Sequence, residues 1–374
     1  MKNVVVCCDG TANEFAQDRT NVVKLFYALL HDPGRQIAYY HPGLGTMEPP
    51  GALTGIGRTV TKMLGLTFGY GLSADIRDAY VFIMNHFEVG DRLFLFGFSR
   101  GAYTVRVLSA MLKLYGLIPK GNDALVPYVV RMLMSIGKLD RKKRRRSYCR
   151  VACMSPQSSR NDVGAYFRLA GQFRKAYGTR QCMPHFVGVW DTVSSVGWVS
   201  NPLTIPFTTK PHIRSGRHAV SIDERRAFFR ENLWRSPGGN IKQVWFPGVH
   251  CDVGGGYPER ESGLSKVALR WMLTEAAADG LLLEPDRAQR VLGGGAEYVA
   301  PDPHAGMHRS LTARWWIAEV VPKLRYGWGP TQWEFRANWA RRRVIPSGAM
   351  VHDAAYQQGA EYLARLPPDA VRVM

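Results

Sequence analysis

Residues 92–103, RLFLFGFSRGAY, constrain the fold of this chain more than any other stretch. After Arg92, residues 93–96 are apolar and rich in aromatic side chains, so the run 92–96 is typical of a buried strand in a parallel sheet. Two glycines flank Ser99, and the residues after them have apolar side chains at helical spacing. This G-x-S-x-G sequence therefore stands between a strand and a helix, the setting in which a strained turn presents a nucleophilic serine. The alternative interpretation is a glycine-rich turn that happens to carry a serine.

Strand-like and helix-like patterns alternate along the chain. The expected strands are residues 2–8, 36–40, 92–96, 185–190 and 241–246, and the expected helices are 21–30, 72–87, 217–229 and 264–283. This alternation predicts an α/β fold of the alpha/beta-hydrolase type, with a mostly parallel, doubly wound sheet and helices on both faces. The glycine-rich segment 51–71 is expected to cover the sheet edge as a flexible loop.

The chain has 374 residues, of which 46% are hydrophobic, so it is long enough for one large core. We expect a single alpha/beta-hydrolase domain over residues 1–374. Residues 118–180 break the alternation and are expected to be an inserted lid or membrane-contact region above the site. Residues 300–374 are rich in tryptophan and arginine and are expected to be a C-terminal extension packed on the domain.

The formal net charge is +19, which favours polyanionic partners such as anionic lipid or nucleic acid. The sequence carries no helix-turn-helix, zinc-finger or RNA-binding signature, so it does not support a specific nucleic-acid partner. The apolar stretch 125–136 runs into Lys138 and then into a basic run, which is the candidate lipid-surface element. Its residues are Arg141, Lys142, Lys143, Arg144, Arg145 and Arg146. The equally open alternative is a lid helix followed by a solvated loop.

The six cysteines form no C-x-x-C pair and show no metal spacing, so we expect reduced thiols, no metal and no cofactor. The apolar run at the N-terminus is too short for a signal peptide, and no stretch reaches the ~18 apolar residues of a membrane span. The expected location is therefore the cytoplasm, with peripheral membrane contact as an open possibility.

Polar residues that can do chemistry follow the expected strands. They are Asp9, His41, Ser99, Asp191, and His250 together with Asp252. Burying such groups at a sheet rim costs free energy unless they have partners, so packing alone does not explain them. They predict acyl transfer by a serine hydrolase. A second interpretation is a metal-dependent phosphoesterase in which Asp9, Asp191, His250 and Asp252 hold a divalent cation. A third is a non-enzymatic, basic membrane-surface module.

In the serine-hydrolase interpretation, Ser99 attacks a carbonyl, a histidine takes its proton and a carboxylate orients that histidine. Asp191 is the favoured acid, because a strand next to the nucleophile strand would deliver it to the rim. His250 is the favoured base, because it sits at a strand end in a glycine-rich loop. The order Ser, Asp, His matches alpha/beta-hydrolases. Asp252 as the acid and His352 as the base remain open.

An acyl-transfer site also needs donors for the developing oxyanion. The expected donors are the backbone N–H of Arg100, which follows the nucleophile, and one from the loop that contains Gly10 and Thr11. This loop follows the first expected strand.

Seven blocks of the sequence, in the same order, resemble the catalytic domain of type VI secretion phospholipase effectors, an alpha/beta-hydrolase family. The blocks are DGT (9–11), GLGT (43–46), GFSRGAYTVR (97–106), VGVWDTVSSVG (187–197), RHAVSIDERR (217–226), VWFPGVHCDVGGGY (244–257) and VH (351–352). The resemblance implies a Ser-Asp-His lipase or phospholipase acting on bacterial membranes. It places the nucleophile at Ser99, the acid at Asp191 and the histidine at His250 or His352. It also implies delivery by type VI secretion, with a secretion-apparatus or immunity protein as partner.

Overall fold

The computed structural model describes residues 1–10, 19–43, 68–135, 157–193, 197–198, 201–202, 205, 207–227, 229–235, 239–312, 315–320, 323–326 and 333–374. The expectations for Thr11, for most of the glycine-rich segment 51–71 and for the basic run 141–146 lie outside these residues.

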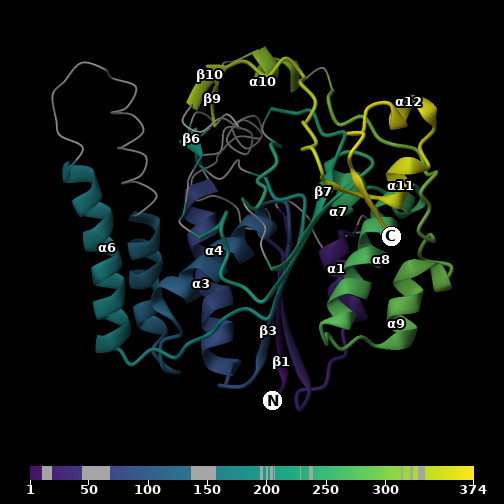
Figure 1. Ribbon diagram of the computed structural model, residues 1–374. Helices are drawn as coiled ribbons and strands as arrows, with labels where there is room; N and C mark the ends of the chain where they lie inside the picture. The colour runs from purple at the N-terminus through teal and green to yellow at the C-terminus, as the bar shows by residue number, and fades with distance from the viewer. Residues whose placement is uncertain are drawn as a thin grey trace, which may run out of the picture.

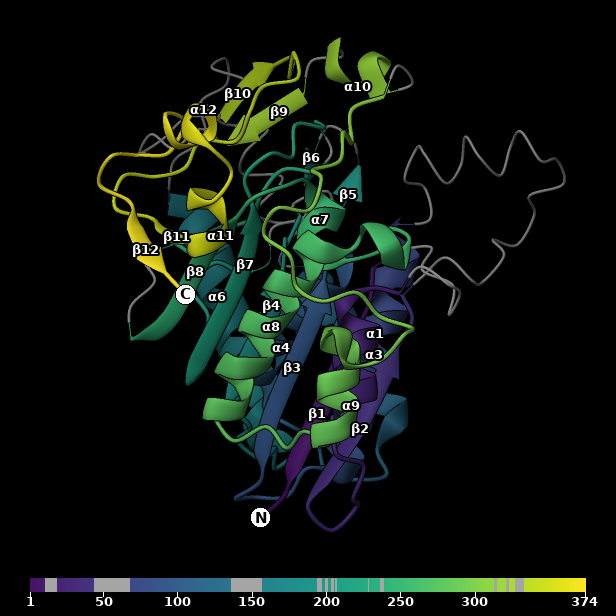
Figure 2. The same ribbon diagram turned by 90° about the vertical axis from the view of Figure 1, so that its right-hand side faces the viewer.

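The centre of the fold is a sheet of eight strands in the order β12-β11-β8-β7-β4-β3-β1-β2 (Figures 1 and 2). The strands are β1 (Asn3–Cys8), β2 (Gln36–His41), β3 (Arg92–Phe98), β4 (Phe186–Trp190), β7 (Ser215–Ser221), β8 (Asn240–Phe246), β11 (Met350–His352) and β12 (Val371–Val373). Every pairing between neighbours in this order is parallel. The predicted mostly parallel, doubly wound α/β fold is confirmed.

Helices cover both faces of the sheet, as Figure 1 shows. On one face lie α3 (Phe68–His86), α4 (Arg100–Tyr115) and α6 (Gln157–Ala176), and on the other α1 (Asn21–Ala28), α8 (Gly263–Ala278) and α9 (Pro285–Gln289). Shorter elements are β5 (Gly197–Trp198), β6 (Asn201–Pro202), α7 (His250–Gly254), α10 (Trp316–Val320), β9 (Lys323–Tyr326), β10 (Trp333–Arg336), α11 (Asp353–Tyr356) and α12 (Ala360–Leu363).

Successive side chains of a strand point to opposite faces, so each central strand contributes side chains to the cores on both sides of the sheet. In β3, Leu93 and Leu95 belong to the core under α3 and α4, while Phe94 and Phe96 belong to the core under α1 and α8. Both faces are thus apolar, which explains why β3 is a continuous hydrophobic run.

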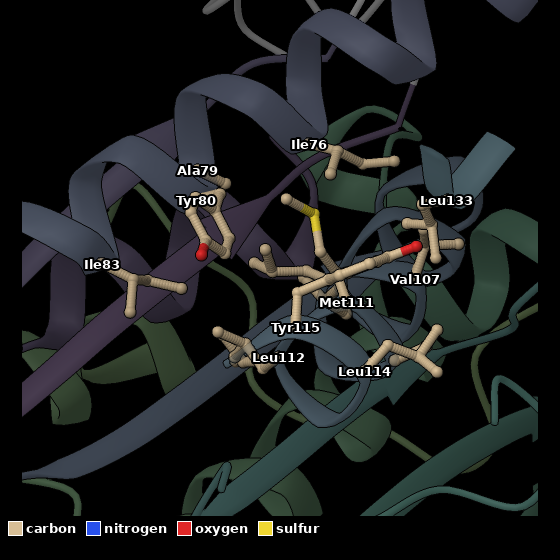
Figure 3. Packing of buried hydrophobic residues seen from close by; sticks show 14 of the residues in the cluster. Ile76, Ala79, Tyr80, Ile83, Val107, Met111, Leu112, Leu114, Tyr115 and Leu133 are labelled. Carbon is tan, nitrogen blue, oxygen red and sulfur yellow. The ribbon is translucent and has the colours of Figure 1, made fainter. Parts of the chain in front are cut away.

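The helix α3 packs on α4, the helix that follows the Ser99 turn (Figure 3). Ile76, Tyr80 and Ile83 recur at helical spacing on α3 and meet Val107 and Met111 of α4 in the same buried cluster. This contact holds the middle of α4 against α3.

The helical residues 126–135 belong to the region expected to be an insertion. Val126, Val129, Val130 and Leu133 are buried in the core beside α3 and α4, whereas Tyr128 is exposed. The apolar face of this helix is therefore occupied by the protein itself.

The helix expected over residues 217–229 is wrong, because residues 215–221 form β7 between β4 and β8. Arg217 and His218 give this strand a polar sequence, yet both are buried with partners. Arg217 pairs with Glu275 at 2.5 Å, and His218 accepts a hydrogen bond from the Thr192 N–H at 3.2 Å. Burial lowers the pKa of His218 to about 3, so the ring is neutral and fits the core.

The C-terminal part of the chain joins the sheet. Residues 350–352 and 371–373 add β11 and β12 next to β8, while α10, β9 and β10 lie at the top of the view in Figure 2. Part of the segment 300–374 is thus integral to the sheet.

Candidate active site

The turn that carries Ser99 is strained in the way a nucleophile elbow requires. Ser99 has φ 57° and ψ −115°, a conformation that residues with a side chain rarely adopt. A Cβ on Gly97 would lie 2.5 Å from the Gly101 carbonyl oxygen, and one on Gly101 would lie 2.0 Å from the Cys8 carbonyl oxygen. Both glycines are therefore needed for the tight passage from β3 to α4, with the turn against the end of β1.

Replacing Gly101 with alanine is expected to destabilise the fold by about 1–3 kcal/mol, because β1 or the turn must move to admit the methyl group. The matched control is Gly171→Ala in α6, where a Cβ meets nothing within 4 Å. The control is expected to be neutral or stabilising, since alanine favours a helix interior. Urea unfolding of the two variants checks this. Equal effects would show that the elbow is not tightly packed.

The ends of β1 and β2 meet beside this turn. A Cβ on Gly43 would lie 2.4 Å from the Gly10 carbonyl oxygen, so the two loops touch. The Asp9 carboxylate accepts hydrogen bonds from the Thr20 hydroxyl at 2.5 Å and the Tyr40 hydroxyl at 2.9 Å. These contacts tie β1, α1 and β2 together next to the elbow.

The three expected oxyanion donors, Arg100, Gly10 and Thr11, differ in what the structure shows for their backbone N–H groups. Arg100 is the first residue of α4 and directly follows Ser99. The Gly10 N–H donates to the carboxylate of Asp9 at 2.7 Å and is thus already engaged. Thr11 lies outside the described residues.

His250 and Asp191 form a buried pair. Nδ1 of His250 lies 2.6 Å from Oδ2 of Asp191, and both side chains are at most 4% exposed. Asp191 directly follows β4 with φ 36°, and His250 begins α7 after β8. In the neutral ring, an Nδ1–H that donates to this carboxylate leaves the lone pair on Nε2.

The same histidine lies against the residue that precedes Ser99. The rings of Phe98 and His250 have centroids 4.6 Å apart, and a Cβ on Gly254 would lie 1.9 Å from the Phe98 ring. The helix α7 therefore lies directly on the end of β3, which brings His250 to the strand that carries Ser99.

Arg343 was not predicted as part of the site. Its Nη1 donates to Oδ1 of Asp191 at 2.5 Å and its Nη2 to Oδ2 at 3.1 Å, while the Ser221 N–H donates to Oδ1 at 2.9 Å. Burial alone raises the pKa of Asp191, but the charge of Arg343 and the hydrogen bond from His250 outweigh it and hold the pKa well below its usual range. Asp191 is therefore ionised. In the sequence, Arg343 is only the last residue of the basic run 341–343.

Glu224 and Phe229 also contact His250 and were missed. Oε2 of Glu224 accepts from the His250 backbone N–H at 3.3 Å, and the Phe229 ring packs edge-on to the imidazole at 4.8 Å. Burial raises the pKa of Glu224, but its ion pair with Arg226 outweighs this and lowers the pKa to about 2. Both residues fall in the stretch expected to be a helix, so the sequence offered no sign of their positions.

Asp252, the alternative acid, is paired with another histidine. Its Oδ1 lies 2.6 Å from Nδ1 of His308, and its Oδ2 accepts from the Val249 N–H at 2.9 Å. Nε2 of His308 lies 3.2 Å from Glu261, and the Tyr257 ring stacks on His308 at 3.7 Å. This second pair secures the turn before α7.

Replacing His308 with glutamine is expected to cost more stability at pH 5.5 than at pH 9. Burial lowers the pKa of His308, but its hydrogen bonds to Asp252 and Glu261 outweigh this and raise it. A raised folded-state pKa contributes stability fully below the unfolded value of about 6.5, and this is lost as the pH rises through the folded value. Because His308 is partly exposed, we expect a difference below about 1 kcal/mol. Urea unfolding at both pH values tests this, with exposed His304→Gln as the control. A larger loss at pH 9 would contradict it.

The other two candidate histidines lie apart from Asp191. Nδ1 of His352 accepts from the Ala354 N–H at 3.1 Å, and its ring stacks on Phe246 at 4.5 Å. Burial lowers the pKa of His352 to about 4. Nδ1 of His41 accepts from the Gly43 N–H at 3.2 Å.

The four residues of the proposed metal site are divided among separate hydrogen-bonding groups. Asp9 is bound to hydroxyl groups, Asp191 to His250 and Arg343, and Asp252 to His308. Within the described residues, no group of three or more His, Cys, Asp or Glu side chains is arranged to hold a metal ion. The geometry does not assemble the ligand set that the phosphoesterase interpretation needs.

The described part of the chain contains no helix with the length and apolarity needed to span a membrane.

The parallel sheet, the strained serine turn and the buried His–Asp pair define an alpha/beta-hydrolase-like protein. Residues 2–275 match the family described as T6SS, Phospholipase effector Tle1-like, catalytic domain, and the chain belongs to this family. The family resemblance expected from the sequence blocks is confirmed, and membership supports a lipid-hydrolase function.

Individual relatives match smaller parts. The uncharacterized protein YEL023C of Saccharomyces cerevisiae is 35% identical over 239 residues, which are 62% of this chain and 32% of that protein. A crystal structure of an uncharacterized protein from Pseudomonas aeruginosa is 18% identical, with a TM-score of 0.44, over 80% of this chain and 49% of that one. The Tle1 effector bound to the VgrG spike of the type 6 secretion system is 16% identical, with a TM-score of 0.37, over 70% and 52%. This chain thus spans about a third of the yeast protein and about half of each solved chain.

Proposed function

We propose that this protein is a serine hydrolase that cleaves carboxylic esters of lipids, as a phospholipase or lipase. Ser99 is the nucleophile, His250 the base and Asp191 the acid. The observation that carries the proposal is the 2.6 Å contact between His250 and Asp191, packed on the strand that ends in the strained Ser99 turn. Membership of a phospholipase effector family supports a lipid ester as substrate.

In this proposal, Nε2 of His250 takes the proton of the Ser99 hydroxyl as Oγ attacks the ester carbonyl carbon. Ionised Asp191 stabilises the imidazolium that forms. The negative charge on the carbonyl oxygen is met by the Arg100 N–H at the start of α4, with the loop that contains Thr11 as the second source. His250 then gives its proton to the departing alcohol, and water releases the fatty acid from Ser99 by the same steps.

We also propose that the basic run 141–146 binds anionic lipid, which concentrates the protein on its substrate. This attraction is screened by salt, so 0.5 M NaCl is expected to weaken vesicle binding and leave cleavage of a soluble ester nearly unchanged. Binding that salt does not affect would contradict it. Delivery by type VI secretion, and a secretion-apparatus or immunity protein as partner, are proposals that follow from the family.

Incubation with phosphatidylethanolamine and phosphatidylglycerol vesicles, followed by lipid mass spectrometry, tests the reaction. The expected products are free fatty acid and lysophospholipid, formed equally with and without EDTA. A phosphorylated headgroup product that disappears with EDTA, and that Ser99→Ala still forms, would instead support the metal-dependent phosphoesterase. Folded protein that binds the vesicles without turnover would support the non-enzymatic membrane module.

A further inference from the structure

The carboxylate of Asp191 is held by a guanidinium from the far end of the chain. Arg343 lies 152 residues after Asp191 and outside the family match, which ends at residue 275. Its side chain is 3% exposed and contacts both carboxylate oxygens, the two-pronged geometry that arginine forms best. Nη1 also donates to the Ser221 hydroxyl at 2.7 Å, and Nη2 donates to the Phe229 carbonyl oxygen. Arg343 therefore joins the acid to the loop that packs on His250.

The backbone before Arg343 turns so that this arginine points into the protein. Trp339 and Ala340 have φ 53° and 50°, which turns the backbone inward after β10. The buried carboxylate of Glu319 holds this turn, because it accepts from the Ala340 N–H at 3.0 Å and from the Ala227 N–H at 2.6 Å. The same turn leaves the two preceding arginines of the basic run exposed. Only Arg343 is directed at the acid.

We propose that Arg343 is a positioning residue of the His250–Asp191 pair, and that its charge limits how strongly Asp191 holds a proton on His250. The inference rests on the proposed function, in which His250 must be neutral to act as the base. A buried carboxylate facing an imidazole alone would favour the protonated ring. A guanidinium on the same carboxylate opposes that effect. The two-pronged contact also fixes Oδ2 where Nδ1 meets it.

Other charged groups near His250 are already paired among the described residues. Glu224 is bound to Arg226, and Asp252 to His308. Among the described residues, the titratable and charged groups on the helix of His250 and on the elements around it include Asp191, Arg343, Glu224, Arg226, Glu231, Cys251, Asp252 and His218. Arg343 is the cation bound to the acid itself.

Three variants separate charge from geometry. Arg343→Gln removes the charge and keeps one donor, Arg343→Lys keeps the charge and removes the two-pronged contact, and Arg342→Gln is the control for net charge.

The readout is the pH titration of the His250 Cε1–H resonance in 13C-histidine-labelled protein, assigned with His250→Asn. Arg343→Gln is expected to raise the titration midpoint by roughly one pH unit or more, since charges this close shift protonation by that amount. Arg343→Lys and Arg342→Gln are expected to stay within about 0.3 units of wild type. The fluorophosphonate labelling rate falls as the pH is lowered, and the midpoint of this fall should shift in the same direction.

An unchanged midpoint in Arg343→Gln, or an equal shift in Arg342→Gln, would overturn the inference. If Arg343→Gln does not fold, Arg343→Lys tests the positioning role. Its labelling rate at the high-pH plateau is expected to fall by about tenfold, while the titration midpoint of His250 is expected to stay unchanged. A wild-type plateau would then overturn the positioning role. The midpoint is measurable whether or not Ser99 reacts. Wild-type protein that resists labelling, with the midpoint still shifted in Arg343→Gln, would refute the proposed hydrolase and leave the effect of Arg343 standing.

Discussion

Replacing Ser99 with alanine is expected to lower ester hydrolysis by about 10⁴- to 10⁶-fold and to abolish fluorophosphonate labelling, because the hydroxyl is the atom that forms the acyl intermediate. Labelling followed by gel fluorescence, and fatty-acid release from vesicles, measure the two effects. The matched control is Ser109→Ala, which removes a buried hydroxyl from α4, the helix that follows Ser99. It is expected to label at the wild-type rate. Full labelling of Ser99→Ala would reject Ser99 as the nucleophile.

Replacing His250 with alanine is expected to lower kcat by about 10⁴- to 10⁶-fold, since a serine without its base is a poor nucleophile. His352→Ala is the comparison, because it also removes a buried histidine. His352 stacks on Phe246 and accepts the Ala354 N–H, so its loss is expected to reduce stability and to leave kcat within a few-fold of wild type. Initial rates with a soluble p-nitrophenyl ester measure both. A collapse of kcat in folded His352→Ala, with His250→Ala active, would move the base to residue 352.

Local sequence signals were sufficient to predict the elements around Ser99. The apolar run of β3, the two glycines and the helical spacing of α4 all lie within about two dozen residues, and each has a local physical cause. The strand ends were likewise predictable, because parallel strands bring their carboxyl ends to one edge of the sheet. His250 and Asp191, chosen on that argument, lie in contact.

The missed features depend on partners far away in the sequence. β7 looked too polar for a strand because the Glu275 carboxylate that pairs with Arg217 lies 58 residues on. Arg343 looked like a surface charge because its partner, Asp191, lies 152 residues earlier in the chain. Asp252 looked like a second acid because its partner His308 is 56 residues away. Buried ion pairs of this kind become visible only when the fold has brought both charges together.

The most direct test of the account is a crystal structure of the protein after reaction with a small fluorophosphonate. The account predicts a phosphorus–oxygen bond at Oγ of Ser99. It also predicts Nε2 of His250 within about 3 Å of that oxygen or of a phosphonyl oxygen, with the His250–Asp191 contact intact. A probe bound at any other residue, or an imidazole of His250 that no loop movement can bring to Ser99, would contradict it.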